Sequence, residues 1–223
     1  MRYLGLALFA EGPTDYRFLS PLLTRAVAEI CLAHGQTRLD ISDVIPLDTP
    51  ELYREDRRST RIREAARAAW GSFHLLFVHS DGWNDPDRVR EEQTCPGMRE
   101  VAELAADDVY EGIAVVPVRE TEAWALCDGD ALRAAFQTTL ADEDLYVPQR
   151  ARDAERLLDP KATLELAYTN VLGGSGRKRG RTSASFLTLI AETIDLGTLR
   201  ELPSFKRLHD DMETALKNMH VLR

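Results

Sequence analysis

Tyr3-Leu-Gly-Leu-Ala-Leu-Phe-Ala-Glu11-Gly12-Pro13-Thr14-Asp15 is an apolar run that ends at a glutamate and a glycine. Its uncharged part is too short to cross a bilayer and too uniformly apolar for a half-exposed strand, so it predicts a buried strand of a parallel sheet. Ligands of open α/β sheets bind beyond the carboxyl ends of the strands. We therefore expect Glu11 to point into such a crevice, with Gly12 allowing a tight turn. The alternative interpretation of this fragment alone is a solvated loop glutamate.

Three further stretches predict the remaining strands, at residues 43–48, 73–80 and 112–118. Between the strands, apolar side chains recur with helical spacing in residues 14–31, 55–70 and 98–110. In the first of these helices, Pro21 marks either a helix start or a kink. The alternation predicts an α/β fold with a parallel sheet of about four strands and helices on both faces.

The strand signal ends near Asp128, and helical patterns follow at residues 159–168, 183–194 and 204–219. We interpret residues 1–127 as the α/β core and residues 128–223 as a helical extension packed on it. No linker-like composition separates the two parts, which favours an extension over an independent domain.

The composition is that of a globular protein, with 44% hydrophobic and 29% charged residues in a chain of 223. The net charge of −9 argues against a protein that coats nucleic acid with its whole surface, but it allows a local basic site. Cys31, Cys95 and Cys127 form no CxxC pair, which argues against a zinc site or a disulfide framework and favours the cytoplasm. We expect no association with a membrane.

Acidic residues follow three of the predicted strands directly. Glu11 ends the first strand, Asp81 ends the strand at 73–80, and Glu120 and Glu122 follow the strand at 112–118. Parallel strands have their carboxyl ends at one edge of the sheet, so these carboxylates are expected on the same side of the molecule. Converging carboxylates repel one another, which raises a pKa or recruits a divalent cation, and Mg²⁺ suits them as a hard ion that also binds phosphates. Such a site would activate water for attack on a phosphodiester.

The motifs around these acids resemble those of a known fold family. Glu11-Gly12-Pro13-Thr14-Asp15, followed by Phe18-Leu19, resembles the opening of Toprim-like proteins, and His79-Ser80-Asp81-Gly82 resembles their aspartate motif. The chain is also similar to a bacterial Toprim-like family of unknown function through residues 117–128, 159–161 and 203–205, of which Glu120-Thr-Glu-Ala-Trp124 is the most specific. The resemblance implies a Toprim or Rossmann-like sheet and relatives that act on phosphodiesters with Mg²⁺, including overcoming-lysogenization-type nucleases.

The same resemblance implies roles for individual residues. Glu11 would be the acid–base or metal residue and Asp81 a metal ligand. The expected second aspartate is replaced by Trp83, and Asp85 in the same loop is the substitute ligand. Glu120 and Glu122 are the candidates that complete the metal sphere, with Mg²⁺ or Mn²⁺ as the ion. The resemblance further implies an AAA-type ATPase partner and a role in phage defence.

Basic residues suggest where a nucleic acid would bind. The run Arg177-Lys178-Arg179-Gly-Arg181 precedes a predicted helix start and is the best candidate for phosphate contacts, although a solvated loop is an equally good interpretation. Lys161 lies at another predicted helix start and is a further candidate. The arginines of residues 57–67 are interpreted as the solvated face of a helix, with a secondary DNA-facing role as the alternative. His79 is interpreted as packed or hydrogen-bonded, and not as a ligand.

Three hypotheses about function follow. The first is a Mg²⁺-dependent nuclease that cuts DNA or RNA with Glu11, Asp81, Asp85 and Glu120 or Glu122. The second is a degenerate Toprim subunit that binds or regulates an ATPase without cutting, which Trp83 motivates. The third, a nucleotide- or phosphoester-processing enzyme, is weaker because no phosphate-binding glycine motif follows the first strand.

Overall fold

The computed structural model describes residues 2–36, 38–105, 109–173 and 182–222. These ranges contain a parallel sheet whose strands are β1 (Arg2–Phe9), β2 (Leu39–Pro46), β3 (Leu75–His79) and β4 (Glu111–Val115). The strand order is β2-β1-β3-β4, and Leu8 of β1 lies between Pro46 of β2 and Phe77 of β3. The predicted α/β fold with four parallel strands is therefore confirmed.

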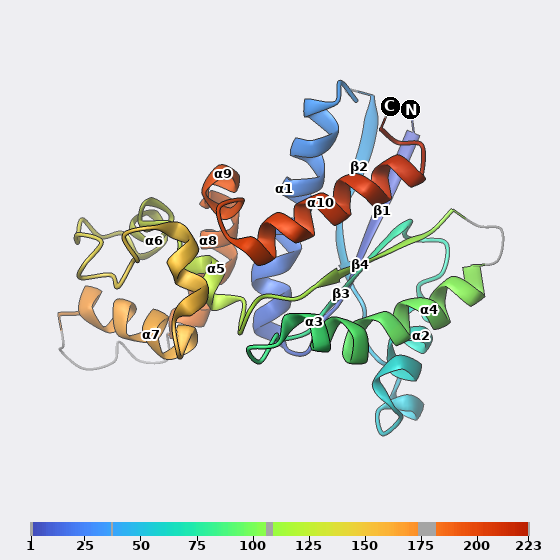
Figure 1. Ribbon diagram of the computed structural model, residues 1–223, viewed down its shortest axis with the longest axis horizontal. Coiled ribbons are helices and arrows are strands. Elements are labelled where there is room, and N and C mark those ends of the chain that lie inside the picture. Colours follow the sequence, from blue (N-terminus) through green and yellow to red (C-terminus); the bar gives the residue numbers. More distant parts are fainter. Residues whose placement is uncertain (1, 37, 106–108, 174–181, 223) are drawn as a thin grey trace.

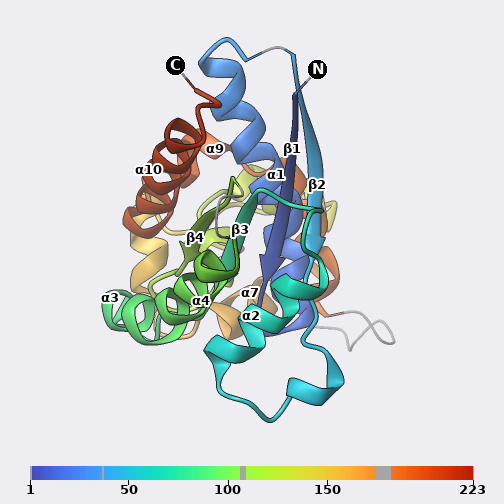
Figure 2. The ribbon, with the colours of Figure 1, turned by 90° about the vertical axis from the view of Figure 1, so that its right-hand side faces the viewer.

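Helices cover both faces of the sheet because its strands are apolar on both sides. Leu4, Leu6 and Leu8 of β1 pack with α1 (Pro13–Ala33) and α10 (Pro203–Asn218) on one face. Ala7 and Phe9 point to the other face, where α2 (Arg58–Ala68) and α4 (Cys95–Ala105) lie. Figure 2 shows α10 and α2 on opposite sides of the strands.

Several helices differ from the sequence-based expectation. Helix α1 continues through Pro21 without ending there. The helix expected at 98–110 begins earlier, because α3 (Pro86–Val89) and the π-helical turn η2 (Arg90–Thr94) lead directly into α4. A short 3₁₀ turn, η1 (Glu51–Tyr53), precedes α2. Within the described ranges, no helix has both the length and the hydrophobicity that a membrane crossing requires.

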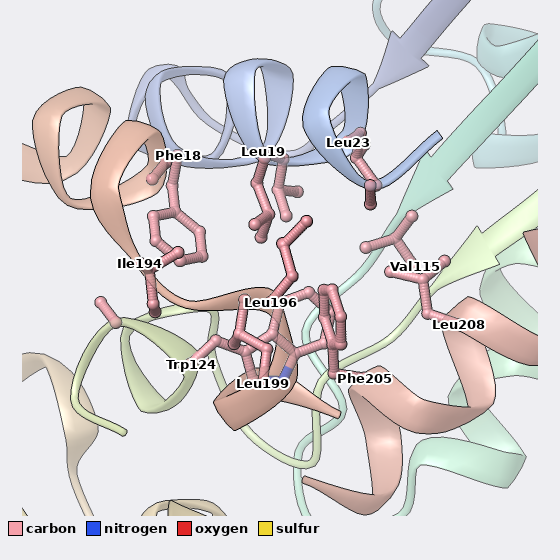
Figure 3. Packing of buried hydrophobic residues seen from close by; sticks show 14 of the residues in the cluster. Phe18, Leu19, Leu23, Val115, Trp124, Ile194, Leu196, Leu199, Phe205 and Leu208 are labelled. Carbon is pink, nitrogen blue, oxygen red and sulfur yellow. The ribbon is translucent and has the colours of Figure 1, made fainter. Parts of the chain in front are cut away.

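The second half of the chain is helical apart from its loops. Its elements are α5 (Glu122–Ala125), α6 (Gly129–Phe136), η3 (Ala151–Arg156), α7 (Pro160–Val171), η4 (Ser183–Phe186), α8 (Leu187–Thr193) and α9 (Leu196–Leu199). Figure 1 shows these helices beside the sheet, at the end where β4 leads into α5, while α10 returns along the sheet. Side chains of α1, α5, α9 and α10 meet in one hydrophobic cluster (Figure 3).

The strand order places a switch point between β1 and β3. From β1 the chain crosses through α1 to β2 on one side, and from β2 it crosses through α2 to β3 on the other side of β1. Ligands of open α/β sheets bind at such a point, beyond the carboxyl ends of the two strands. In this chain, Glu11 follows β1 and Asp81 follows β3 at this edge.

Candidate metal centre

Glu11 is held in place by two groups from neighbouring segments. The hydroxyl of Ser80, just after β3, donates a hydrogen bond of 2.6 Å to Oε1 of Glu11. The guanidinium of Arg58, at the start of α2, lies 3.3 Å from the same oxygen and also donates to the carbonyl of His79. The glutamate predicted to mark the site is therefore fixed over the carboxyl ends of β1 and β3.

Asp15, in the first turn of α1, brings a second carboxylate to this place. Its Oδ2 accepts a hydrogen bond of 3.0 Å from the backbone N–H of Gly12. Its Oδ1 lies 3.4 Å from the hydroxyl of Thr121, in the loop after β4. The backbone of Gly12 is extended, with φ −143°, so the expected glycine-specific turn is wrong. The position of Asp15 is set by the start of α1, where its carboxylate accepts the hydrogen bond from Gly12.

His79 lies between Asp15 and Asp81 and is fully buried. Its Nδ1 is 3.8 Å from Oδ2 of Asp15, and its Nε2 is 3.5 Å from Oδ1 of Asp81. Neither ring nitrogen has a hydrogen bond. A neutral imidazole carries only one N–H, so one of its nitrogens presents a lone pair to a carboxylate oxygen. That contact is repulsive unless a proton or a cation lies between the two atoms.

Burial and mutual repulsion change the protonation of these groups. Burial, together with the charges of Asp15 and Glu11, raises the pKa of Asp81 to about 7. Burial lowers the pKa of His79 to about 4, so the imidazole is neutral at neutral pH. Burial also raises the pKa of Asp15. The site therefore gathers more negative charge than its own protein groups neutralise.

The two glutamates after β4 join the same group of acids. Glu120 and Glu122 both act electrostatically on Asp81 and raise its pKa. Oε2 of Glu120 is buried without a hydrogen bond. Glu122 is almost fully buried beside Thr121, and burial raises its pKa. The charges of Glu11, Glu120 and Glu122 therefore reach Asp81 at this edge of the sheet, but of these four acids only Asp81 belongs to the described group whose ligand atoms lie within 4.8 Å of one another.

Asp85 has a structural task in the same loop. Its carboxylate caps α3 by accepting a hydrogen bond of 3.1 Å from the backbone N–H of Arg88, and the residue is exposed. It lines a hollow of about 280 Å³ together with Glu11 and Ser80. The role of Asp85 as a metal ligand stays a prediction.

The structure describes one of the five residues predicted to contact nucleic acid. Arg177, Lys178, Arg179 and Arg181 fall outside the described residues. Lys161 is exposed at the start of α7 and lines a hollow of about 390 Å³ with Glu122. Its charge favours the ionised forms of Asp15 and Glu122. Lys161 therefore lies beside the acidic site, and its contact with nucleic acid stays a prediction.

The sequence did not predict Asp15, Ser80 or Arg58 as parts of this site. Asp15 belongs to the quoted Glu11–Asp15 motif, so the motif carried a signal for it. Arg58 was interpreted as part of the solvated face of its helix, and this is wrong, because its side chain is only 19% exposed and reaches Glu11. His79 was interpreted as packed or hydrogen-bonded; it is packed, and neither ring nitrogen has a hydrogen bond.

The donor set suits a divalent cation. One ligand atom each from Asp15, His79 and Asp81 lies within 4.8 Å of the others. Among the buried side-chain atoms without hydrogen bonds are both nitrogens of His79, Oδ1 of Asp81 and Oε2 of Glu120. Carboxylate oxygens suit Mg²⁺ and Mn²⁺, and an imidazole is a better ligand for Mn²⁺ than for Mg²⁺.

Comparison with known proteins gives a family but no function. Residues 10–213 match the family described as a domain of unknown function (DUF4276). No curated protein and no solved structure matches the chain. The relationship to Toprim proteins therefore stays a prediction.

Proposed function

We propose that this chain, which belongs to the DUF4276 family, is a metal-dependent nuclease that hydrolyses phosphodiester bonds of DNA or RNA. One observation carries the proposal. The neutral imidazole of His79 is buried between two carboxylates without a hydrogen bond, at the switch point where α/β sheets bind their ligands. A divalent cation among these groups would remove the repulsion between lone pairs.

The residues that would hold the ion are Asp15, His79 and Asp81, with Glu120 or Glu122 completing the sphere. The ion is Mg²⁺ or Mn²⁺. When bound, it would neutralise charge on the phosphate and lower the pKa of a coordinated water. Asp81 must give up its proton to act as a ligand, since its pKa is about 7.

Glu11 would orient and deprotonate the attacking water. Ser80 and Arg58 both contact Oε1, and among the described residues none donates a hydrogen bond to Oε2. The second oxygen is thus free to accept a proton from water in the hollow that Glu11 lines. The guanidinium of Arg58 lies beside Glu11 as a fixed positive charge that favours an approaching phosphate.

The test is cleavage of plasmid and single-stranded substrates by the purified chain with Mg²⁺ or Mn²⁺. We expect Glu11→Gln and Asp81→Asn each to reduce the cleavage rate by at least about 100-fold. Asp130→Asn on the exposed surface of α6 is the control. Asp85→Asn tests the remaining predicted ligand, because asparagine also caps helices and would keep α3 in place. Cleavage that survives Glu11→Gln or Asp81→Asn would contradict the mechanism, and loss of cleavage in Asp85→Asn would restore Asp85 as a ligand.

A second candidate is a subunit that binds without cutting. Trp83 stands where the resemblance expects an aspartate, and Arg58 already gives Glu11 a positive partner. In this case the chain would act with an AAA-type ATPase in phage defence. Calorimetry separates the two candidates. The nuclease would bind Mn²⁺, and Asp81→Asn would abolish this binding. A subunit that binds its partner without cutting would show no Mn²⁺ binding through Asp81.

A further inference from the structure

We propose that the hollow beside Trp83 binds one unpaired nucleobase, so that the substrate is a single-stranded nucleic acid. This inference rests on the proposed function, because it names the substrate class of the same site. It starts from an aromatic side chain in an unusual position. Trp83 is 72% exposed, whereas large aromatic side chains are mostly buried, and its backbone has φ 49°.

The loop that carries Trp83 is held firmly. The N–H of Gly82 donates to the carbonyl of Arg119 at 2.8 Å, and the N–H of Asn84 donates to the carbonyl of Val118 at 3.0 Å. A Cβ atom on Gly82 would lie 2.0 Å from the carbonyl oxygen of Pro117, so the two loops are in direct backbone contact. An indole presented by such a loop is preorganised for stacking.

The walls of the hollow fit the chemistry of a base. It encloses about 180 Å³, and Trp83, Leu158 and Pro160 supply apolar surface. Leu158 is 83% exposed, so this surface is open to a ligand. Asn84, Arg119 and Glu120 supply polar groups in the same hollow. The carboxylate of Glu120 lines this hollow and can accept a hydrogen bond from the amino group of a base, which leaves Glu122 to complete the metal sphere.

The hollow adjoins the candidate metal centre. Trp83 also lines the hollow that contains Glu11 and Ser80, so this residue borders both spaces. A base stacked on Trp83 would therefore place the adjoining phosphate near the carboxylates. In a duplex, the faces of a base are covered by its neighbours and its pairing edge is occupied, so only an unpaired base fits. An exposed tryptophan also suits a protein partner, but the polar groups inside the hollow favour a base.

The test measures binding without cleavage. Fluorescein-labelled oligonucleotides are titrated with the full chain carrying Glu11→Gln in Mg²⁺ at low ionic strength, and fluorescence anisotropy is recorded. The oligonucleotides are single-stranded DNA, single-stranded RNA and a duplex of the same sequence, and electrophoresis verifies that they stay intact. We expect at least one single strand to bind about 10-fold more tightly than the duplex. The two single strands separate DNA from RNA as the source of the base.

Variants locate the binding energy. Adding Trp83→Ala should weaken binding of the single strand by about 10-fold or more, since stacking contributes about 1–3 kcal/mol per base, and Trp83→Phe should keep most of it. Tyr146→Ala is the matched control, because Tyr146 is also an exposed aromatic residue with positive φ, at 57°. It should leave binding unchanged.

Two outcomes overturn the inference. The first is equal affinity for the single strand with and without Trp83→Ala. This result is also expected if Trp83 binds a protein partner. The second is equal affinity for single strand and duplex. Neither result tests metal-dependent cleavage, which is measured separately. Conversely, if a base stacks on Trp83 but the chain never cleaves, the proposed nuclease activity is refuted and the proposed base-binding site is retained.

Discussion

Asp81 carries a conflict between stability and the proposed activity. Its pKa is raised to about 7 in the folded protein, above the value near 4 of an exposed carboxyl, so the folded state holds this proton more tightly than the unfolded state. The contribution to stability is therefore fully present below about pH 4 and is lost as the pH rises through 7. At pH 8 and without metal, we expect Asp81→Asn to be more stable than the wild type by about 1–3 kcal/mol. Chemical denaturation at pH 5 and pH 8 measures this, and the advantage should be smaller at pH 5, where the folded state keeps its proton.

At pH 8, bound metal should make the wild type more stable than Asp81→Asn. Mn²⁺ binds only the folded wild type and stabilises it by mass action, whereas the variant has lost a ligand. Thermal unfolding with and without Mn²⁺ tests this, with Asp130→Asn as a control on the exposed surface of α6. If Asp81→Asn were less stable than the wild type at pH 8 without metal, burial and the neighbouring carboxylates would not destabilise the ionised Asp81.

The same residues show how far the sequence predicts the site. Glu11, Asp81 and Glu120 were predicted because each directly follows an apolar strand, and parallel strands end at one edge. Asp15 and Arg58 could not be placed in this way, since both are in the first turn of a helix and their direction depends on how the helix meets the sheet. His79 was recognised as buried, but the lack of a hydrogen bond depends on the positions of Asp15 and Asp81.

At the scale of elements, the loop after β3 packs backbone to backbone against the loop after β4. Gly82 is buried against the loop after β4, and a Cβ atom there would lie 2.0 Å from the carbonyl oxygen of Pro117 and 2.6 Å from that of Val118. Backbone atoms cannot move aside as a flexible side chain can. We therefore expect Gly82→Ala to cost at least about 2 kcal/mol of stability. Chemical denaturation measures the loss.

Gly12→Ala is the control for this loop. The backbone of Gly12 is extended, and a Cβ atom would meet Oδ2 of Asp15 at an ordinary 3.6 Å. We expect a loss below about 0.5 kcal/mol. If the two variants were equally stable, the close approach of the two loops would not exist in solution.

The elements themselves were predicted better than their boundaries. Uniform apolar runs identified β1, β3 and β4, because a strand buried on both faces needs apolar residues throughout. The edge strand β2 contains two aspartates and a serine, and the strand predicted at 43–48 overlaps only its second half. Helix α1 passes Pro21 without ending, a choice that the sequence left open. The run from α3 to α4 begins at Pro86, 12 residues before the apolar spacing predicted it, because the cap at Asp85 and the π-helical turn do not follow a period of 3.6 residues.

At the scale of the molecule, the helical extension and the sheet share one hydrophobic core. Trp124 of α5 and Phe205 of α10 are fully buried and stack edge to face, 5.2 Å apart, in a cluster that includes Leu19 of α1 (Figure 3). The indole N–H of Trp124 donates to Ser204, whose backbone N–H donates to the buried Glu155. These contacts cross the boundary expected near residue 127, so removing residues 128–223 would expose the core of the sheet.

Phe205→Ala tests whether the two parts unfold together. The change removes a buried aromatic side chain that touches both, so we expect a loss of about 3–5 kcal/mol. Because the core is continuous, the loss should appear equally in circular dichroism, which follows all helices, and in tryptophan fluorescence, which follows Trp124 at the junction together with Trp70 and Trp83 near the sheet. Trp83→Phe in both proteins removes the exposed tryptophan from that signal. Separate transitions from the two probes would instead show that the extension folds independently.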